Sequence, residues 1–237
     1  MRKYRFHLMG AVLMAFSGVA SAGVCQAPFM HDAGFLSLNG DGLLRVQAQM
    51  QLSNVRVLSD NECEAFVTGD ASFGLAGLPA GSSKLNYWMR VKDGMARFER
   101  DIGGGQREEV KGGFDLNLLG LFNYDQAIQQ TGQQLPAQRF SVQFDKRAQE
   151  PVAVHTTAKT VGAPQQLSTV AGDQQCYPIE YQRTIAATQA SISGLTLPIP
   201  EMRSQVTDWY CPSVQMVMRQ DSVQNGVPSY IEVQALR

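Results

Sequence analysis

The chain has 237 residues, with 20 Lys+Arg against 21 Asp+Glu and a formal net charge of −1. Residues 1–22 hold three of the basic residues and none of the acidic ones, which leaves 17 against 21, or −4, for the rest. No basic stripe is present to neutralise phosphates, so the composition excludes an electrostatic footprint for nucleic acid. The part after residue 22 is long enough to bury a core of its own.

Residues 1–22 are typical of a cleaved export signal. The first five residues carry three positive charges, an apolar stretch follows from Leu8 to Phe16, and Ala20-Ser21-Ala22 is an A-x-A cleavage site. The apolar stretch is shorter than the ~20 residues that usually span a bilayer. We therefore predict cleavage after Ala22 and a periplasmic domain over residues 23–237 with no transmembrane segment.

Four cysteines, Cys25, Cys63, Cys176 and Cys211, all lie after the signal. An even number in an oxidising compartment indicates disulfides. Of the three possible pairings we favour Cys25 with Cys63 and Cys176 with Cys211, because each pair falls within one half of the chain. Each bridge would close a loop of about 35 to 40 residues, worth roughly 3 to 4 kcal/mol. A lipid anchor on Cys25 is disfavoured, since the preceding residues do not match the lipidation signal.

Alternation of polar and apolar residues is the dominant pattern. Arg45–Leu52 places Arg and Gln on one face and Val, Ala, Met and Leu on the other, which predicts a half-buried strand. The phase changes after Asn54, as it does at a β-bulge. Leu85–Val91 followed by Asp93-Gly94 predicts a hairpin, and Asn225-Gly226 predicts a second one near the end of the chain.

The best helical candidate is Leu116–Gln130, where leucines, Phe122 and Ile128 recur at near-helical spacing. It would be a core helix or a lid with an apolar underside. The glycines and charged residues of 101–113 predict a mobile loop or a long hairpin end. Strand patterns fill the second half. The expected fold is mainly β: a single domain with a strongly curved antiparallel sheet, a half-barrel, and one or two short helices packed on the concave face.

The sequence lacks the residue patterns that most enzyme chemistries require. The part after the signal has only His31 and His155, with no G-x-S-x-G, no P-loop and no C-x-x-C, so we expect neither a catalytic triad nor a metal site nor a cofactor. Asp208, beside Trp209, is expected to be a solvated acid at a strand end; the alternative is a buried acid that could serve chemistry. Seven acids leave an acidic dyad open, since they could meet in space: Glu99, Asp101, Glu108, Glu109, Glu180, Glu201 and Asp208.

From residue 161 onward the chain carries an ordered set of short motifs: a small-residue turn, a strand, a long hairpin, Trp-Tyr-x-Pro and closing strands. They are Val161-Gly162-Ala163-Pro164, Thr169-Val170-Ala171-Gly172, Cys176-Tyr177-Pro178-Ile179-Glu180-Tyr181, Asp208-Trp209-Tyr210-Cys211-Pro212 and Met216-Val217-Met218. The set resembles uncharacterised periplasmic proteins related to the half-barrel lipoprotein carrier and receptor proteins of the outer-membrane lipoprotein pathway (LolA/LolB-like). The resemblance implies a concave face that holds an acyl chain. Cys211 departs from the pattern, standing where the family usually has a small polar residue.

Three functional hypotheses follow. The first is a non-enzymatic envelope protein that binds or chaperones an apolar or lipidated ligand in a groove. Its candidate groove residues are Tyr87, Met89, Leu119, Phe122, Trp209, Met216 and Met218. The second is a structural or assembly module that docks an envelope partner through a sheet edge. The third is a hydrolase with an acidic dyad.

Overall fold

The computed structural model describes residues 23–42, 44–59, 61–75, 78–110, 119–122, 124, 128–142, 151–192 and 195–237. The expected signal peptide lies outside these residues. Their secondary structure is a short 3-10 helix, η1 (Val24–Gln26), and seventeen strands. The first eight strands are β1 (Phe35–Asp41), β2 (Leu44–Ser59), β3 (Glu62–Leu75), β4 (Leu78–Lys92), β5 (Met95–Gly103), β6 (Gln106–Glu109), β7 (Gln134–Leu135) and β8 (Arg139–Val142). The others are β9 (Val152–Thr156), β10 (Lys159–Val161), β11 (Gln165–Thr169), β12 (Gly172–Ile185), β13 (Thr188–Ile192), β14 (Leu195–Ile199), β15 (Met202–Cys211), β16 (Met216–Gln224) and β17 (Val227–Leu236).

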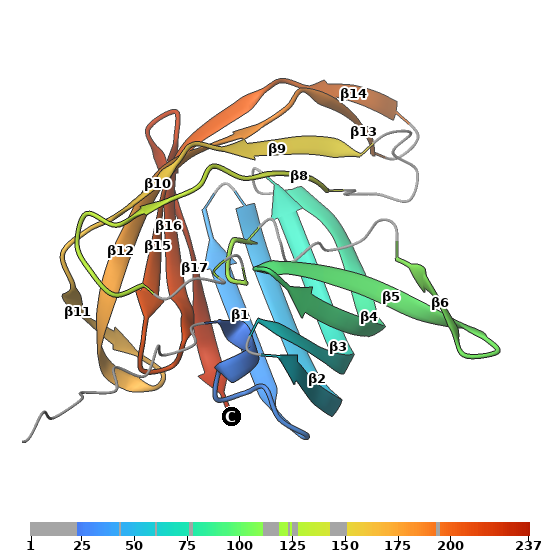
Figure 1. Cartoon of the computed structure of the whole chain (residues 1–237). Helices are drawn as coiled ribbons and strands as arrows, with labels where there is room; N and C mark the ends of the chain where they lie inside the picture. The colour runs from blue at the N-terminus through green and yellow to red at the C-terminus, as the bar shows by residue number, and fades with distance from the viewer. Residues whose placement is uncertain are drawn as a thin grey trace, which may run out of the picture.

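Fifteen of the strands form one antiparallel sheet, in which twelve follow the order β6-β5-β4-β3-β2-β1-β17-β16-β15-β12-β10-β7 and β8, β9 and β11 lie off this path (Figure 1). The pairing of β1 with β17 joins the first and the last strand in the middle of the sheet. β12 is long enough to pair with β10 and β11 over one part and with β9 over another. β13 and β14 form a separate two-stranded sheet. The chain is thus mainly β and antiparallel, as expected.

The alternating sequences form these strands because every second side chain faces the core. In β2, Val46, Ala48, Met50 and Leu52 are all at most 2% exposed. The register of β2 with β3 shifts between Ser53 and Arg56, which confirms the bulge predicted from the change of phase. Both predicted hairpin turns are present, because the turn residues take positive φ: Asp93 (48°), Gly94 (69°), Asn225 (51°) and Gly226 (78°).

One face of the large sheet carries the main hydrophobic core, and we call it the apolar face. Buried side chains from β1 to β5, β12 and β15 to β17 belong to one cluster. A second, smaller cluster under β8, β9 and the end of β12 contains Val142, Val152, Val154 and Ile185. The large cluster also includes residues outside the sheet, among them Phe29 and Phe122, whose ring centroids lie 6.5 Å apart.

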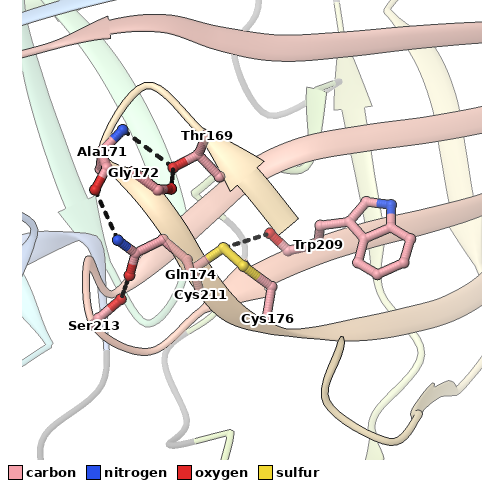
Figure 2. Close-up of a disulfide and its surroundings, with 8 residues drawn as sticks. All are labelled: Thr169, Ala171, Gly172, Gln174, Cys176, Trp209, Cys211 and Ser213. Atoms are coloured by element: carbon pink, nitrogen blue, oxygen red, sulfur yellow. Dashed lines mark hydrogen bonds between the residues drawn. A yellow bond between two sulfur atoms is a disulfide. The ribbon is translucent and has the colours of Figure 1, made fainter. Parts of the chain in front are cut away.

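Both disulfides have the predicted pairing. Cys25, in η1, is bonded to Cys63 in β3, so the segment before β1 is covalently tied to the apolar face. Cys176 is bonded to Cys211 across the adjacent strands β12 and β15, and the Trp209 indole points away from this bridge (Figure 2). The two bridges indicate an extracytoplasmic location.

The expected helix over Leu116–Gln130 is wrong for its described residues, because Leu119 is in 3-10 conformation and the others form turns, a bend and irregular chain. The physical reason is Gly120, whose φ of +71° lies in the left-handed region and cannot continue an α-helix. Residues 101–113 contain the predicted long hairpin end, because β5 and β6 pair across a turn at Gly104 and Gly105. Within the described part of the chain, no helix has the length and apolarity to cross a bilayer.

Candidate functional site

Residues 119–122, 124 and 128 pack on the apolar face, and none of these described residues belongs to a strand. We call them the cover segment. Five of its side chains are at most 5% exposed: Leu119, Leu121, Phe122, Tyr124 and Ile128. The cover segment contains no cysteine, so non-covalent contacts alone hold its described residues on the sheet.

Beneath the cover segment, the sheet presents a set of buried polar side chains, which we call the polar cluster: Lys159, Tyr181, Arg183, Asp208 and Gln220. Asp208 in β15 and Gln220 in β16 are direct cross-strand partners. Lys159 and Asp208 are 1% and 0% exposed, although charged side chains are rarely buried to this degree. Such groups require partners that satisfy their charge and hydrogen-bonding capacity.

Hydrogen bonds connect the polar cluster to the cover segment. Tyr124 Oη donates to Asp208 Oδ2 at 2.5 Å. Gln220 Nε2 donates both to the Leu119 carbonyl at 2.5 Å and to Asp208 Oδ1 at 2.7 Å. Arg183 Nη1 donates to Gln220 Oε1 at 3.2 Å. Since Arg183 occupies the amide oxygen, the amide nitrogen of Gln220 faces the cover segment and Asp208.

The ammonium of Lys159 completes the arrangement. It lies 4.5 Å from the ring centroid of Tyr124 and 4.7 Å from that of Tyr181, which are cation–π distances. One of these rings belongs to the cover segment and the other to β12. Lys159 therefore bridges the cover segment and the sheet.

Gly120 allows the cover segment to approach this closely. A Cβ atom at this position would lie 2.9 Å from Gln220 Nε2, 3.2 Å from Tyr181 Oη and 3.3 Å from Asp208 Oδ2. The backbone of Gly120 thus rests directly on the polar cluster. Both the positive φ and the lack of space favour glycine at this position.

Burial dominates the electrostatics of the polar cluster. It raises the pKa of the Asp208 carboxyl above its ordinary 3.8, while Lys159 and the hydrogen bonds from Tyr124, Gln220 and Tyr181 each act to lower that pKa. Burial first, and the neighbouring Asp208 second, raise the pKa values of Tyr124 and Tyr181 well above 10.0. Both phenols therefore stay protonated as donors to Asp208 at neutral pH.

The structure brings together six of the seven candidate groove residues. Tyr87, Met89, Leu119, Phe122, Met216 and Met218 are buried in the main core, from 0% to 7% exposed. Trp209 alternates with the buried Asp208 and Tyr210 on β15, so its side chain lies on the opposite face. There its Nε1 donates to Asp221 Oδ2 at 2.8 Å.

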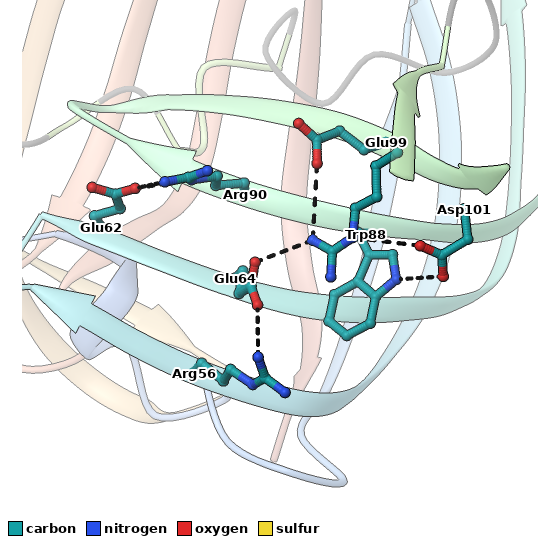
Figure 3. A network of polar contacts seen from close by, with 8 residues as sticks. Arg56, Glu62, Glu64, Trp88, Arg90, Glu99 and Asp101 are labelled. Atoms are coloured by element: carbon teal, nitrogen blue, oxygen red, sulfur yellow. Dashed lines mark hydrogen bonds and ion pairs between the residues drawn. The ribbon is translucent and has the colours of Figure 1, made fainter. Parts of the chain in front are cut away.

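The candidate acids are dispersed. On the face opposite the core, Arg107 lies 3.9 Å from the centroid of the Trp88 ring and pairs with Glu64, Glu99 and Asp101 (Figure 3). Glu99 and Asp101 do meet, but around a shared guanidinium that neutralises them. Asp208 is wrong as a solvated strand-end acid, because it is fully buried in the polar cluster.

Other places on the described part of the chain offer less to a ligand. A shallow hollow of 440 Å³ lies at the base of the β13–β14 hairpin, lined by Ala187, Thr188, Gln189, Pro198, Ile199 and Pro200, without a charged side chain. Among the described residues, no three His, Cys, Asp or Glu side chains are grouped as a metal site would require. The cover segment and the polar cluster are thus the most developed candidate site.

Sequence reasoning missed the polar cluster, although a signal was present. Asp208 alternates in phase with Val206 and Tyr210, and Gln220 with Met216 and Met218. A polar residue in the apolar phase of a strand is expected to be buried, and a buried polar group needs hydrogen-bond partners. The partner on the cover segment, over 80 residues away for Tyr124 and Asp208, has no sequence signal.

Comparisons with known proteins show the fold alone. The sequence matches no protein-family model, and no curated protein matches it either. A crystal structure of a candidate lipoprotein from Parabacteroides distasonis is similar with a TM-score of 0.50 and 13% identity, covering 92% of this chain and 99% of that one. A candidate exported protein with a YmcC-like fold from Bacteroides fragilis has a TM-score of 0.45, 13% identity and coverages of 89% and 99%. The hypothetical lipoprotein YmcC of Escherichia coli has a TM-score of 0.37, 11% identity and coverages of 88% and 89%.

Proposed function

We propose that the protein is a non-enzymatic envelope protein that binds an apolar or acylated ligand on the apolar face, where the ligand takes the place of the cover segment. The observation that carries the proposal is how the apolar face is covered. A sheet face lined with methionines is closed by an irregular segment held only by non-covalent contacts, whereas the neighbouring segment with η1 is tied by a disulfide. Methionine side chains adapt to ligands of varied shape.

The location and the finer fold are part of this proposal. The signal-like residues 1–22, cleaved after Ala22, would deliver the protein to the periplasm. The names of the similar structures, a lipoprotein or an exported protein, agree with an envelope role. A sheet that bends as a half-barrel around its ligand, as in the lipoprotein carriers that the C-terminal motifs resemble, would give the apolar face its concave shape.

The energetics define which ligands can compete. The cover segment buries Leu119, Leu121, Phe122 and Ile128, and full burial of such a side chain is worth about 1.5–3 kcal/mol, or about 6–12 kcal/mol together. An acyl chain gains about 0.8 kcal/mol for each methylene buried, so about 8 to 15 methylenes offset the loss. Chains of twelve to eighteen carbons should therefore bind, and a six-carbon chain should not.

A chain-length series tests the proposal. Monoacylglycerols with six, twelve and sixteen carbons, delivered from cyclodextrin, are titrated into the protein by calorimetry and by thermal unfolding. We expect binding and a rise in Tm for the two longer chains only. The variant Ile199→Ser, at the hollow beside β14, is the matched control and should bind like the wild type. Absence of binding at every length, or loss of binding in the control, would contradict the proposal.

The two other hypotheses stay predictions. Partner docking through a sheet edge gains little from β6, which forms one edge of the large sheet, because its sequence Gln-Arg-Glu-Glu carries three charges and charged edges oppose strand addition. The acidic-dyad hydrolase gains little from Glu99 and Asp101, which are engaged with Arg107.

A further inference from the structure

The cover segment supplies polar groups to the sheet as well as apolar side chains. The Leu119 carbonyl accepts from Gln220 Nε2, and Tyr124 Oη donates to Asp208 Oδ2, both at 2.5 Å. The two sheet groups are adjacent, since Gln220 Nε2 also donates to Asp208 Oδ1 at 2.7 Å. One carbonyl acceptor and one hydroxyl donor, side by side, thus meet one amide donor and one carboxylate.

A ligand that takes the place of the cover segment buries the same sheet groups. With the cover segment in place, Asp208 is 0% exposed and Gln220 is 2% exposed. A buried donor or acceptor that loses its partner costs the full desolvation of that group. A ligand that only fills the apolar volume would leave each group one hydrogen bond short, since Gln220 and Asp208 would keep only their bond to each other and their other sheet partners. A ligand that carries the same two functions would restore both bonds.

The orientation of the amide and the local charge define the head group further. Arg183 Nη1 holds Gln220 Oε1 at 3.2 Å, so Gln220 offers its N–H and not its oxygen to the ligand. The carboxylate of Asp208 already faces the ammonium of Lys159, which lies over the rings of Tyr124 and Tyr181. A second carboxylate beside Asp208 would meet like charge in a medium of low dielectric.

We infer that the ligand is a long-chain acyl ester or amide with a neutral head, whose carbonyl accepts from Gln220 Nε2 and whose neighbouring O–H or N–H donates to Asp208. This inference rests on the proposed function, because it assigns the head group of the ligand that displaces the cover segment. The cover segment is then an internal substitute for the ligand, matching it in both its apolar and its polar contacts.

Four probes with the same sixteen-carbon chain test the inference at pH 8 by calorimetric titration. Monopalmitoylglycerol has the carbonyl and neighbouring hydroxyl donors, methyl palmitate has the carbonyl without a donor, hexadecanol has a hydroxyl without the carbonyl, and palmitate is a carboxylate. A net hydrogen bond corresponds to about a threefold to tenfold change in affinity. We expect monopalmitoylglycerol to bind about threefold to tenfold more tightly than methyl palmitate or hexadecanol, and palmitate to bind no better than these two.

The variant Gln220→Met, which keeps the side-chain length without the amide, assigns the carbonyl contact. It should reduce the preference for monopalmitoylglycerol over hexadecanol to about one, while the preference over methyl palmitate remains. If this variant does not fold, the ranking of the four probes on the wild type decides. Equal binding of all four, or tighter binding of palmitate, overturns the inference and leaves the proposed function standing. If no sixteen-carbon probe binds, both fail.

Discussion

Gly120→Ala is expected to weaken the cover segment and, by the same change, to tighten ligand binding. An alanine at φ +71° costs roughly 1–2 kcal/mol, because the left-handed region crowds Cβ against the backbone. The new Cβ would also lie 2.9 Å from Gln220 Nε2, at the far end of a side chain that can shift by a few tenths of an ångström. The free energy of unfolding should therefore fall by roughly 1–2 kcal/mol.

If the ligand binds only where the cover segment has left, its affinity contains the free energy of displacing that segment. A loss of roughly 1–2 kcal/mol from the cover segment then raises the affinity for monopalmitoylglycerol about 5- to 30-fold. The matched control is Gly226→Ala, in the β16–β17 turn, where φ is +78° and a Cβ would have nothing within 4 Å. It should lose similar stability and leave the affinity unchanged.

Urea denaturation and calorimetric titration of the two variants are the assays. An unchanged or weaker affinity in Gly120→Ala, together with the expected loss of stability, would refute the reasoning, because the cover segment would then be an ordinary part of the core. A gain of affinity in both variants would refute it as well, since general destabilisation would explain the result.

Three further predictions test other parts of the account. Phe122→Ala should lower the free energy of unfolding by about 3–5 kcal/mol and tighten ligand binding, whereas Met89→Ala on the sheet should lower it by about 2–5 kcal/mol and weaken binding. If calorimetric titration shows affinity changes of the same sign in both variants, the division between cover segment and binding face is contradicted. Because the pKa of Asp208 is raised in the folded state, its contribution to stability is full below the ordinary 3.8 and is lost as the pH rises through the folded value. The difference in the free energy of unfolding between wild type and Asp208→Asn should therefore vary over that window. Urea denaturation from pH 3.5 to 8 measures this difference, and a difference independent of pH would disprove the prediction. Replacing both Cys25 and Cys63 with serine should lower the free energy of unfolding by about 4 kcal/mol, because the bridge closes a loop with a sequence separation of 38 residues. A change in the urea midpoint equivalent to less than about 1 kcal/mol would contradict this, since the bridge would then not restrict the unfolded chain as the chain-entropy model requires.

Features with a local cause could be predicted from the sequence. The strand over Arg45–Leu52 follows from a period of two, and the turns at Asp93-Gly94 and Asn225-Gly226 follow from residues that tolerate positive φ. The disulfides follow from the compartment and from the proximity of each cysteine pair along the chain. Neighbouring residues alone decide the strand and the turns, whereas the disulfide pairing also depends on the oxidising compartment.

The rest depends on contacts between distant segments. Leu116–Gln130 has apolar residues at near-helical spacing, yet the close approach of Gly120 to Asp208 and Gln220 overrides that pattern. The position of Asp208 near a strand end predicts a solvated acid, because strand ends are commonly exposed. Its burial depends on Tyr124, which lies in another part of the chain. Burial of charge is a property of the assembled sheet, and sequence alone cannot locate the groups that compensate it.

Hydrogen–deuterium exchange with and without monopalmitoylglycerol tests the displacement of the cover segment most directly. The amides of peptides containing Leu119–Phe122 should exchange faster in the complex, because the ligand releases these residues from the sheet, while the amides of β15 and β16 remain protected. Exchange of these peptides that stays unchanged or becomes slower, under conditions where calorimetry shows the protein to be saturated, would contradict the account.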